Sequence, residues 1–462
     1  MFRRLLIANR GEVAVRIARA CRSMGISPVG VCSTADRGAS WLERMDEAVC
    51  IGGASPRESY LDVARVIQAA RQTSCAALHP GWGFLAENSR FAALCEQHGI
   101  TFIGPSPAVM ERMGRKQPAK LAMRAAGLEL IPGTLGLLRD RAEAVARAEE
   151  IGYPLILKAD AGGGGRGMRI CRSADQVAEA FESATAEARG AFGDGGLYIE
   201  KYLSGGRHVE VQVLCDRFGK SIHLGERECS IQRNHQKLIE ESPSPALSPE
   251  ERQKLGRAAA RAAASIGYVG AGTVEFLLDG SSRPLFIEMN TRLQVEHPVT
   301  EEVTGVDVVK QQIAIAANER LTLEQVEVKS SGHAIECRIN AEDPAQGFRP
   351  TPGVLTAFDI PQDKGTGVIR VDTHLETGQR VPPHYDSLLA KVIAFGKTRD
   401  AAIETMVATL KATRIEGVST TIPVHLAVLG SREFKKGEYD TASLPGWPPK
   451  GAEERAAVRA QE

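Results

Sequence analysis

Residues 288–296, Glu-Met-Asn-Thr-Arg-Leu-Gln-Val-Glu, constrain the fold more than any other stretch of the chain. Every even position is acidic, basic or an amide, whereas Met289, Leu293 and Val295 at odd positions are apolar. Side chains of an extended chain point alternately to opposite faces, so this pattern predicts a strand with one chemically active face. The side chains on that face are Glu288, Asn290, Arg292, Gln294 and Glu296.

The segment before this strip predicts a hairpin that brings two carboxylates together. Residues 272–278 form a strand pattern that contains Glu275, residues 279–284 form a turn, and residues 285–288 return. A six-residue loop would place Leu278 opposite Leu285, and Glu275 opposite Glu288. Two carboxylates about 4 Å apart repel by about 4 kcal/mol at a dielectric constant near 20, so such a pair needs a proton or a cation. With Asn290 as a third oxygen donor, the pair favours Mg²⁺ or Mn²⁺. The alternative is an edge strand whose polar face meets water.

Composition excludes several classes of function. The 462 residues carry a formal charge of zero with interspersed signs, which argues against a general nucleic-acid surface or a membrane anchor. We find no apolar run of about 18 residues and no secretory signal pattern, so we expect a cytoplasmic protein. The nine cysteines are scattered and never form a Cys-x-x-Cys pair, which predicts reduced thiols rather than disulfides or a zinc cluster.

The chain is long enough for about three domains in a mixed fold, α/β in class and α+β overall. Residues 1–113 alternate strand and helix patterns, which predicts a Rossmann-like parallel sheet wrapped by helices. Asp36 could read a ribose there, but residues 9–12 hold one glycine where a dinucleotide fingerprint needs three. From about residue 332 onward, short strand patterns predict a mostly β domain with a helix near 400–412.

A glycine-rich run at residues 162–167 predicts a phosphate-binding loop. It holds five glycines in six positions and lies between strand patterns at 153–158 and 168–171, with Lys158 at its entrance. Glycine lets backbone N–H groups wrap closely around an anion. The alternatives are a hairpin tip and a flexible linker. The run is not a Walker A loop, because no Lys-Ser/Thr follows it, and it could instead close over a nucleotide as a lid.

Ordered motifs over residues 1 to about 446 resemble the biotin carboxylase component of biotin-dependent carboxylases, an ATP-grasp family. The matching blocks are Ile-Ala-Asn-Arg-Gly-Glu at 7–12, His-Pro-Gly-Trp-Gly-Phe at 79–84, Lys158 with the glycine run, Glu-Arg-Glu-Cys-Ser-Ile-Gln-Arg at 226–233, residues 286–298 and residues 333–343. The resemblance implies three domains, at 1–113, 114–330 with a lid at about 133–203, and 331–446, followed by a tail at 447–462.

The resemblance also implies a reaction and its residues. ATP, Mg²⁺ (or Mn²⁺) and bicarbonate would carboxylate biotin at N1′ through carboxyphosphate. Glu275, Glu288 and Asn290 would hold the metal; Glu296 would be the general base; Arg338 would face the ureido oxygen of biotin. Lys237, Arg292, Gln294 and Val295 would hold bicarbonate, and Trp82 and Gly83 would lie beside biotin, Trp82 standing where bacterial members usually have Tyr. The nucleotide would contact Lys116, Lys158, Gly164, Gly165, Met168, Glu200, Lys201, Tyr202, Leu203, His208, Gln232, His235, Glu275, Leu277 and Glu288.

We find no biotin attachment motif of the Ala-Met-Lys-Met type, so we expect biotin to arrive on a separate carrier protein. The resemblance further implies a homodimer that works with a carboxyltransferase subunit. The final acceptor stays open among acetyl-CoA, propionyl-CoA, another acyl-CoA, pyruvate and 2-oxoglutarate. Two alternative functions are an ATP-grasp ligase with an amine acceptor, against which Arg338 argues, and a non-catalytic nucleotide-binding module, which would have lost ligands.

Overall fold

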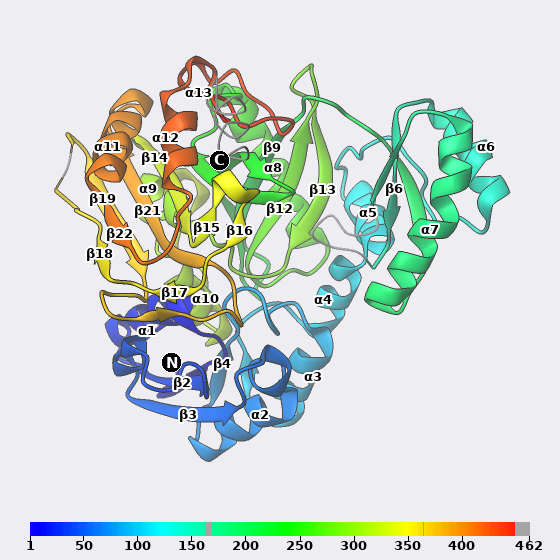
Figure 1. Ribbon diagram of the computed structural model, residues 1–462. Coiled ribbons are helices and arrows are strands. Elements are labelled where there is room, and N and C mark those ends of the chain that lie inside the picture. The colour runs from blue at the N-terminus through cyan, green and yellow to red at the C-terminus, as the bar shows by residue number, and fades with distance from the viewer. Residues whose placement is uncertain (162–167, 364, 449–462) are drawn as a thin grey trace.

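The computed structural model describes residues 1–161, 168–363 and 365–448. Figure 1 shows a main body, with the N-terminal domain at its base, and a lobe built on α6, α7 and β6 that projects to one side. Within the described residues, no helix is long and apolar enough to cross a membrane. All nine cysteines are free, and every one except the half-buried Cys50 is buried.

The N-terminal domain contains a parallel sheet with strand order β3-β2-β1-β4-β5, which confirms the predicted architecture. Helices cover both faces, and β1 is buried from Leu5 to Ile7, as expected for a parallel sheet. The sequence patterns missed β3 and α3. The elements are β1 (Arg4–Ile7), α1 (Gly11–Ser23), β2 (Ser27–Ser33), η1 (Ser40–Arg44), β3 (Glu47–Gly52), η2 (Pro56–Glu58), α2 (Val63–Gln72), β4 (Ala77–His79), α3 (Ser89–Gln97) and β5 (Thr101–Phe102).

Asp36, considered above as a ribose reader, has another partner. The Arg10 guanidinium donates to both of its carboxylate oxygens at 2.8 Å, and the Tyr60 hydroxyl also donates to it. Asp36 and Arg10 are both buried. This ion pair therefore accounts for Asp36 without a nucleotide.

The projecting lobe follows two connecting helices, α4 (Pro107–Gly114) and α5 (Lys116–Ala125). Its antiparallel sheet has the order β7-β6-β8, and α6 and α7 pack against one face. The predicted glycine run, residues 162–167 with Gly164 and Gly165, lies outside the described residues, between β6 and β7. The lobe elements are α6 (Arg141–Ile151), β6 (Leu155–Ala159), β7 (Arg169–Cys171), α7 (Ala174–Phe192) and β8 (Leu197–Lys201).

An eight-stranded sheet, with order β13-β12-β9-β10-β11-β14-β21-β19, forms the centre of the main body. It crosses the domain boundary predicted at residue 330, because β11 pairs with β14. Helix α8 packs on this sheet and begins with a capping box between Ser248 and Glu251. The elements as far as this boundary are β9 (Arg207–Cys215), β10 (Ser221–Arg233), β11 (Gln236–Ser242), α8 (Pro249–Ser265), β12 (Gly270–Leu278), β13 (Pro284–Asn290), α9 (His297–Thr304), α10 (Val308–Ala316) and η3 (Gln325–Glu327).

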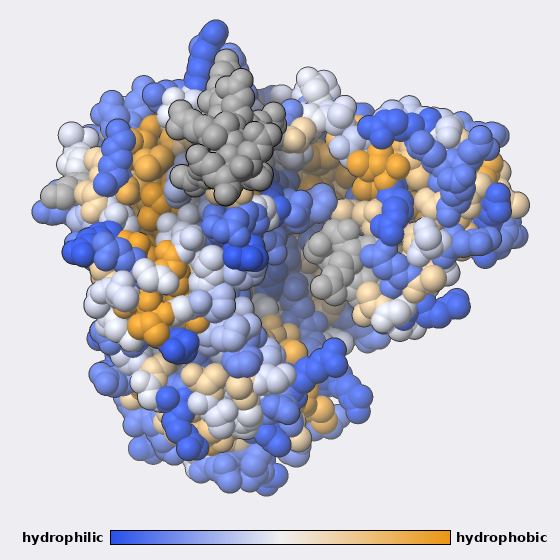
Figure 2. All heavy atoms as spheres, viewed as in Figure 1, coloured by the Kyte–Doolittle hydropathy of each residue, from blue (hydrophilic) through white to orange (hydrophobic). Residues whose placement is uncertain are grey.

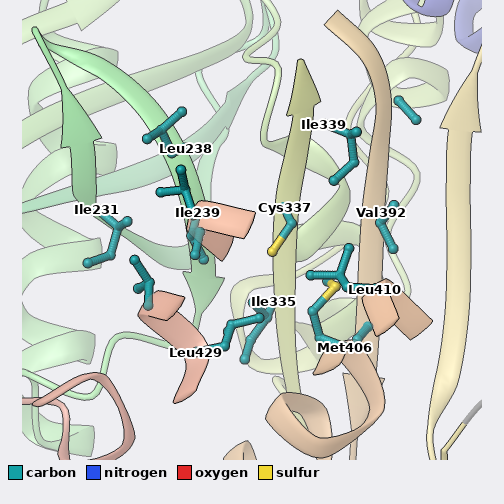
Figure 3. Packing of buried hydrophobic residues seen from close by; sticks show 14 of the residues in the cluster. Ile231, Leu238, Ile239, Ile335, Cys337, Ile339, Val392, Met406, Leu410 and Leu429 are labelled. Atoms are coloured by element: carbon teal, nitrogen blue, oxygen red, sulfur yellow. The ribbon is translucent and has the colours of Figure 1, made fainter. Parts of the chain in front are cut away.

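The C-terminal region adds three strands to this sheet and packs three helices near it. Figure 3 shows side chains of β10, β11, β14 and β21 meeting those of α11 and α12 in one hydrophobic cluster. The predicted helix near 400–412 is confirmed as α11, whereas α12 and α13 were missed. The elements are β14 (His333–Asn340), β15 (Glu342–Asp343), η4 (Pro344–Gln346), β16 (Arg349–Pro350), β17 (Gly353–Val354), β18 (Ala357–Asp359), β19 (Val368–Thr373), β20 (Arg380–Val381), β21 (Leu388–Gly396), α11 (Arg399–Ala412), β22 (Arg414–Glu416), α12 (Ile422–Gly430) and α13 (Arg432–Lys436).

The predicted hairpin forms, but part of its register was wrong. Leu278 pairs with Pro284 rather than with Leu285, since the loop is one residue shorter than predicted. A bulge between Glu275 and Phe276 shifts the register back, so Glu275 does face Glu288. The prediction of one extended strip was also wrong, because β13 ends at Asn290 and residues 291–296 form an irregular connection to α9.

Candidate functional site

A cavity of about 1050 Å³ lies where the central sheet, the lobe and the N- and C-terminal regions meet. Figure 2 shows a hollow with hydrophilic walls between the main body and the lobe. Most of the predicted site residues line this cavity: Trp82, Gly83, Lys116, Lys158, Met168, Lys201, Tyr202, Leu203, His208, Gln232, His235, Lys237, Glu275, Leu277, Glu288, Asn290, Arg292, Gln294, Val295 and Arg338. The sequence thus predicted a dispersed set of residues that the fold brings together.

The two opposed carboxylates, Glu275 and Glu288, each contact a cation. Glu275 lies 2.9 Å from His208 Nε2 and 3.1 Å from Lys237 Nζ, and Glu288 accepts from Lys116 at 2.8 Å. Burial alone would raise the pKa of Glu275, but Lys237 and His208 lower it below its usual value. The carboxylate is therefore ionised at neutral pH.

These donors fit a divalent metal ion. Asn290 donates its amide N–H to Glu275 at 2.6 Å, and a half turn of that amide would present its oxygen on the same side. Two carboxylates and an amide oxygen on adjacent strands form the all-oxygen set that Mg²⁺ or Mn²⁺ prefers. The three residues predicted to hold the metal therefore lie together on paired strands.

Lys237 is the centre of a group of three glutamates. Its Nζ donates to Glu210 and Glu296 at 2.6 Å each, and to Glu275 at 3.1 Å. Glu210 also accepts from the Arg227 guanidinium at 2.6 Å. Glu210 and Glu296 are fully buried, so the lysine offsets negative charge that water cannot screen.

Glu296 lies between two cations. Its contacts are with Lys237 at 2.6 Å and Arg338 at 2.9 Å. Burial favours the neutral acid, but Lys237 and Arg338 outweigh it and hold the pKa of Glu296 well below the usual value. Glu296 is the N-cap residue of α9, whose helix dipole adds to the stabilisation of a negative charge.

Arg292 contacts other groups. Its Nε donates to Glu87 at 3.0 Å, and its Nη1 donates to the Gln294 side chain at 3.1 Å. Glu87 is 45% exposed, whereas Arg292 is 19% exposed and lines the cavity. An anion in the cavity can therefore displace Glu87 from Arg292 at little cost.

At the lobe side of the cavity, Glu200 joins two lysines. It accepts from Lys158 at 2.6 Å and from the buried Lys120 at 2.7 Å. Burial opposes ionisation, yet the two lysines lower the pKa of Glu200 to about 2. Lys201 instead donates to the carbonyls of Gly152 and Tyr153.

Sequence reasoning missed four residues of this site: Lys120, Glu87, Glu210 as a partner of Lys237, and Glu240. Glu240 accepts from Arg338 Nε at 2.6 Å and is fully buried. Strict alternation along β11 does not connect Glu240 with Lys237, because two apolar residues, Leu238 and Ile239, lie between them. No local sequence pattern indicates Lys120 or Glu87, because their partners Glu200 and Arg292 lie 80 and 205 residues away.

Comparisons with known protein families agree with this architecture. Three family models match in order: "Biotin carboxylase, N-terminal domain" over residues 1–110, "Carbamoyl-phosphate synthase L chain, ATP binding domain" over residues 115–324, and "Biotin carboxylase C-terminal domain" over residues 336–445.

Individual proteins match over almost their full length. The chain is 50% identical to Biotin carboxylase 1 of Bacillus subtilis over 453 residues, covering 98% of this chain and 100% of that protein. It is 47% identical to the 2-oxoglutarate carboxylase small subunit of Hydrogenobacter thermophilus over 448 residues, covering 97% and 94%.

Solved structures match as well. The biotin carboxylase domain dimer of Hydrogenobacter thermophilus 2-oxoglutarate carboxylase, in complex with MgADP, ADP and bicarbonate, has a TM-score of 0.92 at 47% identity, covering 96% of each chain. A biotin carboxylase from Campylobacter jejuni has a TM-score of 0.92 at 45% identity, covering 96% and 98%.

Proposed function

Because the chain belongs to the biotin carboxylase family, we propose that the cavity described above is the active site of an ATP-dependent carboxylation of biotin with bicarbonate. The protein is an ATP-dependent carboxylase that uses ATP, Mg²⁺ and bicarbonate. The observation that carries the assignment to this cavity is the buried Glu296 held between Lys237 and Arg338, next to a metal-type donor set.

The nucleotide would bind where the lobe faces the central sheet. Lys116, Lys158 and His235 offer positive charge or N–H donors to the phosphates. Lys201 at the end of β8, with Tyr202 and Leu203 after it, offers a backbone edge to the adenine. Glu200 keeps Lys158 in place. The predicted contacts from Gly164 and Gly165 lie outside the described residues. Met168, Leu277, Gln232 and His208 supply the remaining walls.

Glu275, Glu288 and Asn290 would hold the metal, which when bound neutralises phosphate charge. Phosphoryl transfer leaves the protein little covalent chemistry to do, so its residues position the reactants and spread the developing charge. Lys116 and Lys237, already paired with these carboxylates, lie close enough to take part.

Bicarbonate would bind at Arg292, Gln294 and the Val295 backbone, with Lys237 beside it. Arg292 exchanges Glu87 for the bicarbonate anion. Glu296 then accepts a proton from bicarbonate while the bicarbonate oxygen attacks the γ-phosphate of ATP and displaces ADP. Carboxyphosphate would then split into CO₂ and phosphate in the closed cavity. The released phosphate would take the proton from biotin N1′, and this nitrogen would attack CO₂ to form the N–C bond. Arg338, held by Glu240 and Glu296, donates to the ureido oxygen as negative charge develops there.

Biotin would enter beside Trp82 and Gly83, which line the cavity from the N-terminal domain. We propose that biotin arrives on a carrier protein, that a carboxyltransferase subunit uses the carboxybiotin, and that the chain forms a homodimer. Names of similar proteins include 2-oxoglutarate carboxylase and pyruvate carboxylase subunits as well as biotin carboxylases, so the final acceptor stays open.

The test measures ADP release by the purified chain with Mg-ATP and bicarbonate, with and without free biotin. We expect strong stimulation by biotin that disappears without bicarbonate. If free biotin gives none, a biotinylated carrier domain replaces it, because Trp82 could restrict the free vitamin. No response to either would contradict the assignment, and stimulation by an amine would favour another ATP-grasp ligase.

A further inference from the structure

A fully buried lysine from the C-terminal region, Lys391 on β21, contacts the backbone of the proposed bicarbonate segment. Its Nζ donates to the Val295 carbonyl at 3.0 Å. The same ammonium lies 2.8 Å from Glu12 on α1 and 4.0 Å from Asp372 on β19. Three parts of the fold that are far apart in sequence therefore meet at this one charge.

Burying an ammonium is expensive, and the ion pair with Glu12 does not by itself explain it. A buried ion pair generally gives no more stability than a well-packed apolar pair of the same size. Lys391 is 0% exposed and lies on β21, between β14 and β19, where an apolar side chain would pack. The positive charge of Lys391 therefore indicates a role other than packing.

The segment that Lys391 contacts has few other backbone partners. Residues 291–296 lie after β13 and before α9, so no strand ladder holds them. Their carbonyls accept from the Arg292 guanidinium at Leu293, from His297 at Gln294, from the Val299 N–H at Glu296 and from Lys391 at Val295. The donor from Lys391 comes from another domain, so it sets where the peptide between Val295 and Glu296 lies relative to Arg338.

Lys391 is also directly opposite Arg338 in the pairing of β14 with β21. Arg338 contacts the Glu296 carboxylate, while Lys391 contacts the carbonyl one residue earlier. Two adjacent cations on neighbouring strands thus hold the backbone and the side chain of the same turn. Any shift of that turn would move the Val295 N–H and the Glu296 carboxylate together.

We propose that Lys391 is a positioning residue for bicarbonate, which fixes the Val295–Glu296 peptide and does not touch the substrate. This inference rests on the proposed function, because it concerns how that site binds bicarbonate. Glu12 compensates the charge of Lys391, and Asp372, itself held by Arg370, provides a more distant negative charge.

The test compares two variants that differ only in the donor to Val295. Glu12→Gln removes the charge partner but keeps the ammonium. Glu12→Gln/Lys391→Met removes both charges, so it leaves no unpaired carboxylate at position 12. We expect the KM for bicarbonate of the double variant to be about tenfold above that of Glu12→Gln, the loss of one charge-assisted contact. The dissociation constant for MgADP should agree within about twofold between the two variants.

The same KM for bicarbonate in both variants would overturn the inference, and so would equal losses of bicarbonate and MgADP binding, which indicate a general structural role. If the double variant does not fold, Glu12→Leu/Lys391→Met is compared with Glu12→Leu. Should both doubles fail while both Glu12 controls fold, Lys391 is needed for folding itself and the positioning role is wrong. A wild-type protein without bicarbonate-dependent ADP release would instead contradict the proposed function, before any variant is made.

Discussion

Replacing Glu296 by Gln tests the proposed general base with almost no change of shape. The carboxylate is fully buried and accepts from Lys237 and Arg338. Losing a general base typically lowers kcat by about 10² to 10⁴-fold, or about 3 to 5 kcal/mol of barrier. We therefore expect Glu296→Gln to lose nearly all biotin carboxylation while MgADP still binds within a few-fold of wild type.

The stability of this variant should fall only modestly. The contacts of residue 296 with Lys237 and Arg338 change from ion–ion to ion–dipole. Each change should lower the free energy of unfolding by about 1 kcal/mol, so the total loss is about 2 kcal/mol. Lys237 keeps two other carboxylates, and Arg338 keeps Glu240. The variant should therefore fold, and its unfolding in urea gives the check.

Glu210→Gln is the matched control, because Glu210 is equally buried in the same charge cluster, whereas we propose no proton transfer to it. It contacts Lys237 at the same 2.6 Å and also pairs with Arg227. If activity depends only on the charge balance around Lys237, both variants should lose similar activity. If Glu296 is the base, Glu210→Gln should retain at least about a tenth of wild-type kcat. Wild-type turnover in Glu296→Gln would refute the reasoning.

Three further predictions concern other charges. Glu288→Lys should abolish metal-dependent ATP cleavage with little change in Tm, since this side chain is 39% exposed; retained ADP release would remove Glu288 from the metal set. Glu200→Gln should lower the free energy of unfolding in urea by about 3 to 5 kcal/mol, because it leaves Lys120 buried and unpaired. Adding Lys120→Met should restore more than half of this loss. If it restores none, Lys120 is not the cause of the loss. Glu240 on β11 is paired with Glu336 on β14, and the pKa of each is raised. For Glu240, burial and the negative charge of Glu296 outweigh the effect of Arg338 and raise the pKa from 4.5 to about 7. For Glu336, burial and Glu240 outweigh the effect of Lys391 and raise the pKa well above its usual value. Since the folded state then binds more protons than the unfolded chain, the stabilisation by each carboxyl group is complete below about pH 4.5 and decreases as pH rises, by up to about 1.4 kcal/mol per pH unit for each proton. For Glu240 this decrease ends as pH passes through about 7. Glu336→Gln should flatten the fall of the unfolding free energy between pH 5 and 8, and an unchanged slope would show that the pair binds no extra proton.

The alternating strip illustrates what the sequence could predict. Period-two patterning indicated which side chains share a face, and Glu275 and Glu288 do face each other. The prediction reached this pairing through a six-residue loop that does not exist. The real loop is shorter, because Asp279 accepts from the backbone of Ser281 and Arg283 and tightens the turn, and a bulge compensates. Local side-chain hydrogen bonds of this kind leave no periodic signal.

The ion-pair partners could not be predicted, for a different reason. Lys116 and Glu288 are 172 residues apart, and Arg338 and Glu240 are 98 residues apart. Which charges meet depends on how separate elements pack, and a chain with equal numbers of acidic and basic residues offers many pairings. The sequence therefore indicated the proposed ligand-binding cations but not which carboxylates hold them, and it missed Glu87 and Glu240.

Those carboxylates divide the site into an exchangeable part and a permanent part. The partner of Arg292 is Glu87, which is 45% exposed and can return to water when an anion binds, at a cost typical of surface ion pairs, about 0 to 1 kcal/mol. Glu296 cannot move into water in this way, because it is fully buried between Lys237 and Arg338. Bicarbonate should therefore displace Glu87 and join the existing Glu296 cluster. A base whose pKa is held well below its usual value becomes effective only when an arriving anion draws the cations away from it, so proton transfer is tied to bicarbonate binding.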